Sequence, residues 1–297
     1  MIAAYFGGRA GNQMFTYAFA RKLTETNGGV LIFNFSRGNF ENDIDNFNIL
    51  PYIEKHTNLI LSYGTIKQIS IYYLWKLSYR FAFLQKYRKK IQKLLPLYGL
   101  YDGAYFSYND EVIPPSKQKN SFALGLCENP ICFDDIKEVL QKEFTPKHAL
   151  LDCNKSLYEK IILSNSVCVT IRRGDYISNN EYFLCDKDYF MRAIAEIKKR
   201  VTNPVFIFFS DEISWVRDNI KIEGECYYER GNDPIWEKMR LMYSCKHFIL
   251  SNSSFSWWAQ YLSRNPDKIV ISPSRWHPNP EWTSKLIDKN FVKIEIE

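Results

Sequence analysis

The sequence predicts an α/β protein built from two Rossmann-like domains that face each other across a cleft. From about residue 166 onward, short apolar runs alternate with helical patterns, as parallel βαβ units require. The first 35 residues show the same order of strand, turn, helix and strand in miniature. Because a length of 297 residues suits two domains, we place them at residues 1–150 and 151–297.

The first domain is expected to begin with a strand at Ile2–Phe6, a turn at Gly7–Asn12 and a helix at Gln13–Thr26. A second strand follows at Val30–Phe35, which reads VLIFNF. From about residue 44 to residue 148 the periodicity is helical, but the element boundaries are unclear. This middle segment is rich in aromatic and basic residues, so we interpret it as a helical insertion.

In the second domain, apolar runs indicate strands that are covered on both faces. The clearest strand is Pro204–Asp211, which reads PVFIFFSD. The clearest helix is Asp186–Val201, whose Phe190, Ile194 and Ile197 share one face. The other expected strands are Val167–Arg173, Cys226–Glu229, His247–Asn252 and, as the last of the sheet, Lys268–Ser272, and the other helices are Ser214–Ile220, Ile235–Cys245 and Phe255–Leu262.

The composition is that of an ordinary globular protein, with 46% apolar residues, which excludes disordered and fibrous classes. The sequence contains no run of about 18 apolar residues, so we expect no membrane-spanning helix. The N-terminus lacks the pattern of a secretory signal. The seven cysteines are scattered without the spacing of a zinc site, so we interpret them as buried free thiols. We therefore expect a cytoplasmic protein.

A glycine-rich turn, Gly7–Asn12, lies between the first expected strand and helix. Glycines permit positive φ and close backbone approach, and a helix N-terminus presents N–H groups that bind anions. The glycine spacing matches neither a dinucleotide fingerprint nor a Walker loop. The turn therefore has two interpretations, a phosphate site or ordinary loop geometry.

Two arginines, Arg172 and Arg173, end the first strand of the second domain, and Asp175 follows them. Ligands of open α/β sheets bind at the carboxyl ends of strands, where a guanidinium holds phosphate oxygens and stabilises a leaving group. Side chains alternate along an extended chain, so we expect at most one arginine to face a ligand and the other to pair with Asp175. A surface salt-bridge cluster explains these residues equally well.

Polar residues also follow two other strands. Asp211 suits a ribose hydroxyl or a base N–H group, or alternatively the N-cap of the next helix. The run Ser251–Ser256 passes from strand into helix and contains four serines, more than capping alone requires. With the arginines and the glycine turn, these clusters indicate a site for a nucleotide diphosphate.

Four blocks of the sequence resemble the α-1,2-fucosyltransferases of the inverting, GDP-fucose-using family. Their order and approximate spacing match, and they come from both halves of the chain, whereas residues 45–150 carry no motif that we can place. The blocks are GGRAGNQMFTYAFARKL at 7–23, RRGDY at 172–176, FSDEISWV at 209–216 and LMYSCKHFILSNSSFSWWAQYL at 241–262.

The resemblance implies a GT-B architecture that holds GDP-fucose in the C-terminal domain, with no metal and no cofactor. The reaction implied is a single displacement that inverts a β-linked donor to an α-linked product on a galactose-terminated glycan. Arg172 is the implied catalytic residue, at the β-phosphate. The other implied donor-binding residues are Asp211 at the guanosine, Ser253, Ser254 and Phe255 at the pyrophosphate, and Gly11 and Asn12 from the acceptor-side first domain.

One position departs from the family pattern. The family commonly has histidine two positions before the first arginine, where this chain has Thr170. Any role of that imidazole is therefore absent or supplied elsewhere, and the sequence identifies no general base. Asp175 is acidic and close to Arg172, but pairing with Arg173 is its favoured interpretation, so we assign Arg173 and Asp175 supporting roles.

Three other functions compete with this one. A metal-dependent transferase requires an Asp-x-Asp motif, which occurs at residues 43–45 and 186–188, although such triplets arise easily among 33 acidic residues. A non-catalytic nucleotide-sugar or glycan-binding module is the second, and a transferase that uses a different sugar nucleotide is the third. The four histidines are not spaced as metal ligands, and we interpret each as structural or surface.

The formal charge of +6 is unevenly distributed along the chain. The segment Lys55–Tyr101 carries nine of the 39 basic residues and no acid, together with many aromatic residues. Such a segment suits anionic lipid near a lipid-linked oligosaccharide acceptor, which would place the protein at the periphery of the inner membrane. A solvated helical face over a core is the alternative, and no nucleic-acid partner is needed to explain the charge.

Overall fold

The structure is a computed structural model that describes residues 1–35, 40–177, 185–279 and 284–296. It contains two compact units. The first comprises Met1–Asp45 and Ile49–Glu143, and the second comprises Asn46–Asn48 and Phe144–Glu297. The change of unit therefore falls slightly before residue 150, and one short segment near residue 46 belongs with the second unit.

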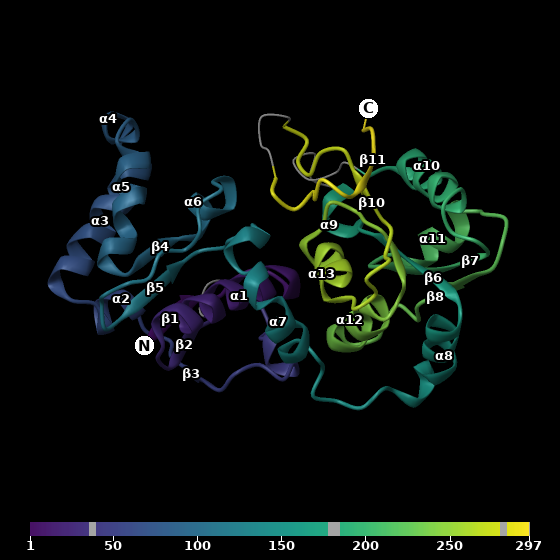
Figure 1. The fold of residues 1–297 in the computed structure, drawn as a ribbon, viewed down its shortest axis with the longest axis horizontal. Helices are drawn as coiled ribbons and strands as arrows, with labels where there is room; N and C mark the ends of the chain where they lie inside the picture. The colour runs from purple at the N-terminus through teal and green to yellow at the C-terminus, as the bar shows by residue number, and fades with distance from the viewer. Residues whose placement is uncertain (36–39, 178–184, 280–283, 297) are drawn as a thin grey trace. The chain divides into compact units, whose positions relative to one another are not determined.

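The first unit contains a parallel five-stranded sheet in the order β3-β2-β1-β5-β4 (Figure 1). The chain leaves β1 outward through β2 and β3, then crosses to β4 and returns to β5 beside β1. The reversal between β1 and β5 is the switch point at which such sheets bind ligands. The strands are β1 (Ile2–Tyr5), β2 (Leu31–Asn34), β3 (Tyr52–Glu54), β4 (Leu100–Asp102) and β5 (Ser121–Leu124).

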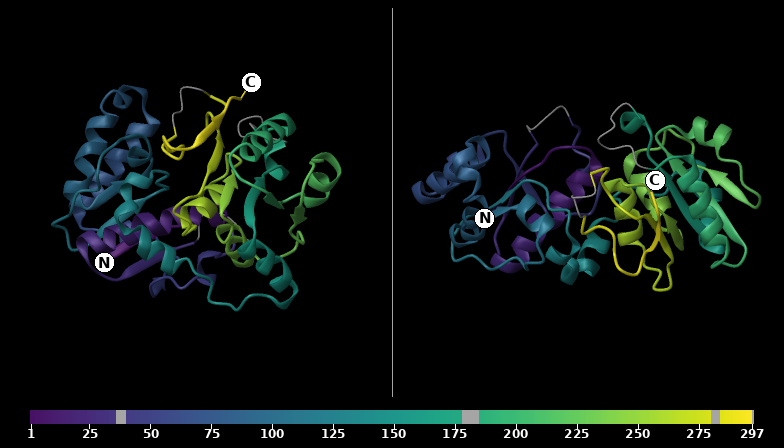
Figure 2. Two further views of the ribbon diagram at one scale, coloured as in Figure 1. Left: turned by 45° about the vertical axis from the view of Figure 1, so that its right-hand side comes forward. Right: turned by 90° about the horizontal axis from the view of Figure 1, so that it is seen from above.

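Helices cover both faces of this sheet (Figure 2). Tyr17 of α1 packs on Phe33 of β2, whereas Tyr72 of α3 joins a buried cluster with Tyr5 of β1 on the other face. The helices are α1 (Ala10–Asn27), α2 (Leu59–Tyr63), α3 (Ile66–Arg80), α4 (Ala82–Gln85), α5 (Arg88–Leu94), α6 (Gly103–Tyr108) and α7 (Lys137–Glu143). The middle segment is thus helical as expected, but it also contains β3, β4 and β5, which the sequence did not predict.

The second unit contains a parallel six-stranded sheet in the order β11-β10-β9-β6-β7-β8. The chain runs from β6 outward to β8 and then returns to β9 on the other side of β6, so the switch point lies between β6 and β9. The expectation that the strand near residue 270 is the last was wrong, because β11 follows it. The strands are β6 (Asn165–Ile171), β7 (Pro204–Ser210), β8 (Cys226–Tyr228), β9 (His247–Ile249), β10 (Val270–Pro273) and β11 (Val292–Ile294).

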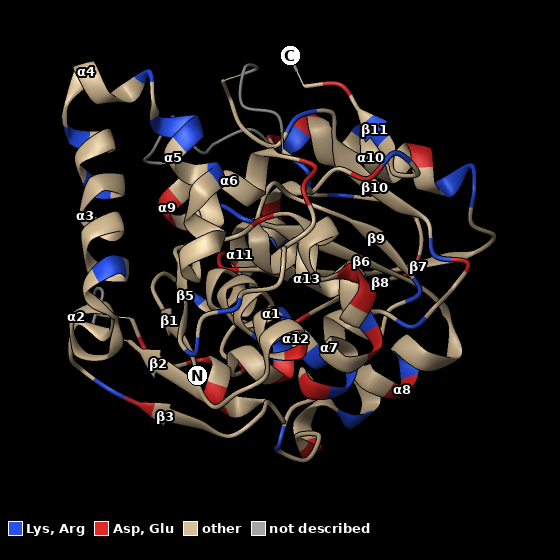
Figure 3. Ribbon diagram, turned by 60° about the vertical axis from the view of Figure 1, so that its left-hand side comes forward, with Lys and Arg blue, Asp and Glu red and all other residues tan. Residues whose placement is uncertain are grey.

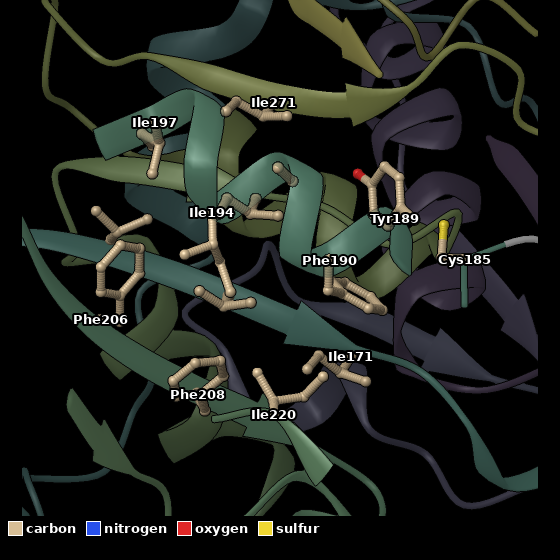
Figure 4. Close-up of a cluster of buried hydrophobic side chains, with 14 of the residues drawn as sticks. Ile171, Cys185, Tyr189, Phe190, Ile194, Ile197, Phe206, Phe208, Ile220 and Ile271 are labelled. Carbon is tan, nitrogen blue, oxygen red and sulfur yellow. The ribbon is translucent and has the colours of Figure 1, made fainter. Parts of the chain in front are cut away.

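The core of the second unit forms where α10 and α11 cover one face of β6 and β7 (Figure 4). Phe190 and Ile194 of α10 are buried against Phe206 and Phe208 of β7. Each such side chain stabilises the fold by about 1.5–3 kcal/mol relative to exposure. Cys168 alternates with Val167 and Val169 of this core, so it faces the opposite side of β6, where its thiol contacts that of Cys245. The helices are α8 (Lys155–Leu163), α9 (Gly174–Ile177), α10 (Lys187–Lys198), α11 (Ile213–Asn219), α12 (Ile235–Tyr243) and α13 (Ser254–Leu262).

The cysteines are free thiols, and five of the seven are buried as expected. Cys153 is exposed, and Cys226 is half-buried, so burial was wrong for Cys153. Across the described ranges, no helix combines the length and apolar character needed to cross a membrane.

Candidate functional site

Arg172 and Asp211 lie together at the carboxyl edge of the second sheet. Strands β6 and β7 pair in register up to Ile171 and Ser210, so the residues that follow each strand are neighbours. The Arg172 Nη1 atom lies 2.9 Å from Asp211 Oδ2, and Nη2 binds the carboxylate of Asp175. The expectation that Asp175 pairs with Arg173 was therefore wrong, because α9 begins at once and turns Asp175 back toward Arg172.

Arg173 points to a different set of partners. Its Nε donates to Glu212 Oε2 at 3.0 Å, and its guanidinium carbon lies 3.3 Å from the centroid of the Trp215 ring. Its backbone N–H also donates to Asp211 Oδ1 at 3.0 Å. The two arginines thus diverge as the alternation predicts, and Arg173 fixes the start of α11 and the position of Asp211.

Gly174 leaves room for the Asp211 carboxylate. A Cβ atom at this position would lie 2.5 Å from Asp211 Oδ2. Asp211 is not the N-cap of α11, as one interpretation had it, since Glu212 occupies that place and no side chain caps the helix. Both oxygens of Asp211 instead hold the chain that follows β6.

Glu229, directly after β8, supports this edge of the sheet and was missed in the sequence. Its buried Oε1 accepts the Ser210 N–H at 2.9 Å, and its Oε2 lies 2.9 Å from Lys238 Nζ. Burial raises the pKa of this carboxyl, and Lys238 opposes the shift. An acid at the end of a third adjacent strand was the available signal, and it was interpreted only as the strand boundary.

Thr170 joins β6 to the chain that follows β9. Its buried hydroxyl donates to the Ile249 carbonyl at 3.2 Å and accepts the Ser251 N–H at 3.3 Å. Thr170, the residue that departs from the family pattern, therefore connects the two strands on either side of the switch point through hydrogen bonds. It brings Arg172 and the serine-rich run to adjacent places along the sheet edge.

The serine-rich run forms the N-terminus of α13. Ser253 is the N-cap residue, but its side chain makes no capping hydrogen bond, and no acid lies in the first turn. The hydroxyls of Ser251 and Ser256 lie 2.9 Å apart and bond each other. Capping thus does not account for the serines. Ser254 and the partly exposed Phe255 are the first two residues of the helix.

Asn252 connects three loops at the same edge, and the sequence reasoning did not single it out. Its side-chain amide donates to the Trp276 carbonyl at 3.2 Å, and its backbone carbonyl oxygen accepts from the Tyr176 hydroxyl at 3.5 Å. Cys185 Sγ lies 3.6 Å from Asn252 Oδ1. Asn252 therefore holds the serine-rich run against the chains that follow β6 and β10.

In the first unit, α1 begins at Ala10, so Gly11 and Asn12 lie in the first helical turn and not in a loop. The Asn12 N–H donates to the Arg9 carbonyl at 2.9 Å, and the Ala10 N–H donates to the Asp43 carboxylate. These two N–H groups therefore already have acceptors within the first unit. Gly8 has a φ of +73°, and a Cβ there would lie 2.7 Å from the Asn12 amide nitrogen.

Gln13 anchors the loop that follows β2 and was missed except as part of a motif. Its buried amide nitrogen donates to the carbonyls of Gly8 at 3.1 Å and Glu41 at 2.7 Å, and its amide oxygen accepts the Asp43 N–H at 3.0 Å. The Asp-x-Asp triplet at 43–45 thus belongs to this local network.

The second Asp-x-Asp triplet serves a helix end, since Asp186 accepts the Tyr189 N–H at 2.8 Å and caps α10. Within the described residues, no three His, Cys, Asp or Glu side chains gather as a metal-binding group.

The edge between β9 and β7 combines two features that suit a diphosphate. Arg172 supplies a guanidinium that is 20% exposed, and α13 presents the N-terminus of a nine-residue helix. Both favour negative charge, and a charge that develops on a departing phosphate is stabilised in the same way. The sequence analysis expected polar clusters at the strand ends, and the strand order adds that these two follow the strands that flank a switch point.

The chain resembles several known transferases. It is 36% identical over 183 residues to an α-1,2-colitosyltransferase of Escherichia coli, a match that covers 58% of this chain and 62% of the relative. A second Escherichia coli relative, the O-antigen biosynthesis glycosyltransferase WbnK, is 31% identical over 187 residues, covering 59% and 62%. The human galactoside α-(1,2)-fucosyltransferase 1 is 26% identical over 176 residues, covering 54% and 45%. Each match thus spans less than two thirds of the relative.

Solved structures share the fold. Fucosyltransferase NodZ from Bradyrhizobium superposes with a TM-score of 0.53 at 11% identity, covering 87% of this chain and 92% of NodZ. A mutant of Arabidopsis thaliana FUT1 in complex with GDP gives 0.50 at 11% identity, covering 93% and 71%. These likenesses confirm the GT-B-like class. The model of Glycosyl transferase family 11 matches residues 1–295, so the chain belongs to glycosyl transferase family 11.

Proposed function

We propose that this chain transfers L-fucose from GDP-β-L-fucose to the 2-hydroxyl of a galactose-terminated glycan, with inversion and without a metal. The observation that carries the proposal is the placement of Arg172 beside the α13 N-terminus at the switch point of the second sheet. The α-1,2 linkage in the names of the relatives supports the position of transfer. The complex of the FUT1 mutant with GDP, in a protein that shares the fold, supports the nucleotide.

In the proposed reaction, the acceptor 2-hydroxyl oxygen attacks the anomeric carbon from the face opposite GDP. The bond from that carbon to the β-phosphate oxygen breaks, its electron pair leaves with GDP, and the hydroxyl proton passes to a base or to water. Arg172 and the α13 N-terminus stabilise the charge on GDP as it forms. A preorganised donor of this kind contributes about 3–4 kcal/mol to the transition state.

The remaining donor contacts follow from the same edge. Ser253, Ser254 and Phe255 begin α13 and are assigned to the pyrophosphate. Asp211 is assigned to the guanosine, because a carboxylate has about four acceptor sites and only two are used by Arg172 and the Arg173 N–H. Gly11 and Asn12 are assigned to the donor on the resemblance alone.

A second donor is favoured by one observation, the name of the 36% identical relative, which gives colitose as the transferred sugar. Colitose lacks the 3-hydroxyl of fucose. A site that hydrogen-bonds this hydroxyl would reject the deoxy donor by about 10⁴-fold, whereas an apolar site would not. The name of WbnK supports an acceptor in bacterial O-antigen synthesis, and with it a cytoplasmic place of action.

The test is a donor comparison with a galactoside acceptor, with GDP release and product linkage measured in the presence and absence of excess EDTA. We expect an α-1,2-fucosylated product at the same rate in EDTA. Preference for GDP-colitose would show that colitose, and not fucose, is the transferred sugar. Complete loss of activity in EDTA would overturn the metal-free mechanism. Binding of GDP-fucose without any release of GDP would identify a binding module instead.

A further inference from the structure

Helix α3 in the first unit has two apolar faces. The inner face contributes Tyr72 and Trp75 to the core, and the Trp75 Nε1 atom donates to the buried Asp102 carboxylate at 2.8 Å. The opposite side of the helix exposes Tyr73, Leu74 and Leu77. An ordinary surface helix has one apolar face and one polar face, so these exposed apolar residues require a separate explanation.

The outer apolar residues form one stripe along the helix. At about 100° per residue, Ile66, Tyr73 and Leu77 fall on one line on the side opposite Trp75. Ile66 is 84% exposed and Leu77 is 40% exposed. Ser70 lies on the same line, and its hydroxyl donates to the Ile66 carbonyl at 2.9 Å, so this hydroxyl is satisfied within the helix.

Further exposed apolar residues follow α3 in the chain. Phe81, at the end of α3, and Phe83, in α4, are both exposed. At this end α3 and α4 project past the sheet of the first unit (Figure 3). Tyr87 and Leu94 extend the exposed apolar surface to α5. We call the exposed side of residues 66–94 the outer face.

Basic residues flank the stripe on both sides. Lys67 lies on one side of it, and Lys76 and Arg80 lie on the other. Lys89 and Lys90 are exposed on α5, and in the described parts of the chain no carboxylate lies within ion-pair distance of any of these five. The blue segments of α3 and α5 in Figure 3 have no red neighbour on these helices.

The acids near this surface do not neutralise it. Asp102 is buried and accepts hydrogen bonds from Trp75, Tyr79 and Gln92. Glu111 lies 3.6 Å from Lys93, a different lysine of α5. The outer face therefore combines an apolar stripe with uncompensated positive charge.

We propose that the outer face binds an anionic lipid surface, with the stripe inserted at the headgroup boundary and the lysines among the phosphates. Charge complementarity selects this occupant. A second copy of the chain on a twofold axis would place these cations against one another. Each lysine near an anionic bilayer raises the affinity about fivefold, and salt weakens this effect. The inference does not depend on the proposed transferase function.

The experiment is sedimentation of the full chain with vesicles of phosphatidylcholine alone or mixed with phosphatidylglycerol. Lys89→Glu/Lys90→Glu reverses two charges on the outer face, and its matched control is Lys289→Glu/Lys293→Glu, which makes the same change of net charge on exposed lysines of the second unit. Leu74→Gln/Leu77→Gln removes two exposed leucines of α3 without changing charge, with the exposed Leu163→Gln as its control.

We expect binding to the anionic vesicles only, weakened in high salt, at least tenfold weaker for either test variant and unchanged for either control. Thermal unfolding and turnover on a soluble acceptor should be unchanged in all variants. Equal binding to both vesicle types, or equal loss in test and control variants, would overturn the proposal. So would a dimer in solution that Leu74→Gln/Leu77→Gln dissociates, because the outer face would then be an interface between copies.

Discussion

The Arg172 guanidinium lies 2.9 Å from the Asp211 carboxylate, and Gly174 leaves the space in which that carboxylate sits. Gly174→Ala would place a Cβ 2.5 Å from Asp211 Oδ2 and displace the side chain. We expect kcat/KM for GDP-fucose to fall at least tenfold, while the free energy of unfolding changes by less than about 1 kcal/mol, because the carboxylate can rotate away.

A double variant checks the route of this effect. If Gly174 acts through Asp211, then Gly174→Ala adds little to Asp211→Asn, and the two losses are not additive. Independent, additive losses would show that Gly174 acts in some other way.

Asp175 is one of two carboxylates that balance the charge of Arg172, and it is half exposed at 53%. Asp175→Asn leaves Arg172 with a single acidic partner, so the binding of GDP should tighten about threefold to tenfold at low salt and less at high salt. Titration calorimetry measures this, with the exposed Asp218→Asn as the control for net charge. Weaker binding would indicate that Asp175 positions Arg172 for the phosphate.

Gln13 satisfies two backbone N–H groups, those of Asp43 and Ile44. Gln13→Ala leaves them without this acceptor, which should lower the free energy of unfolding by about 2 kcal/mol. Urea denaturation measures the change, and the exposed Gln85→Ala should stay within about 0.5 kcal/mol of the parent. An equally small effect of Gln13→Ala would show that the loop does not depend on this side chain.

Burial raises the pKa of Glu128, which follows β5, from 4.5 to about 7. The unfolded chain releases this proton near pH 4.5 and the folded chain near pH 7, so stability is lost as the pH rises between these values and is constant above them. Glu128→Gln cannot ionise, so the variant does not lose this stability as the pH rises. We expect the variant to be more stable by about 3 kcal/mol at pH 8 and by progressively less toward pH 5. A gain that is independent of pH would contradict this assignment.

The two central strands β6 and β7 of the second unit were predictable because they are long and buried. Strand β7 has an uninterrupted apolar run, and the amphipathic pattern of α10 matches the helix observed. Four short strands, β3, β4, β5 and β11, were not predicted, although the equally short β8 and β9 were. Strand β3 has three residues, two of them exposed, and its place is fixed by pairing with β2, which local sequence does not record. Strand β11 was missed for the same reason, because its place is fixed by pairing with β10.

The shared sheet edge of the candidate residues was predictable, but their pairings were not. Strand ends identified Arg172, Asp211 and the start of α13, because parallel strands bring their carboxyl ends to one edge. The partner of Asp175 depended on where α9 begins, and the role of Glu229 on a contact with β7. Both arise from packing between segments that are separate in the sequence.

Substitution of Arg172 tests whether its guanidinium stabilises the departing GDP. We predict that Arg172→Ala lowers kcat for GDP release at least 10²-fold, with the melting temperature close to the parent value, whereas Arg192→Ala, at an exposed position on α10, keeps full activity. Near-normal turnover by a folded Arg172→Ala enzyme would show that Arg172 does not stabilise the departing GDP.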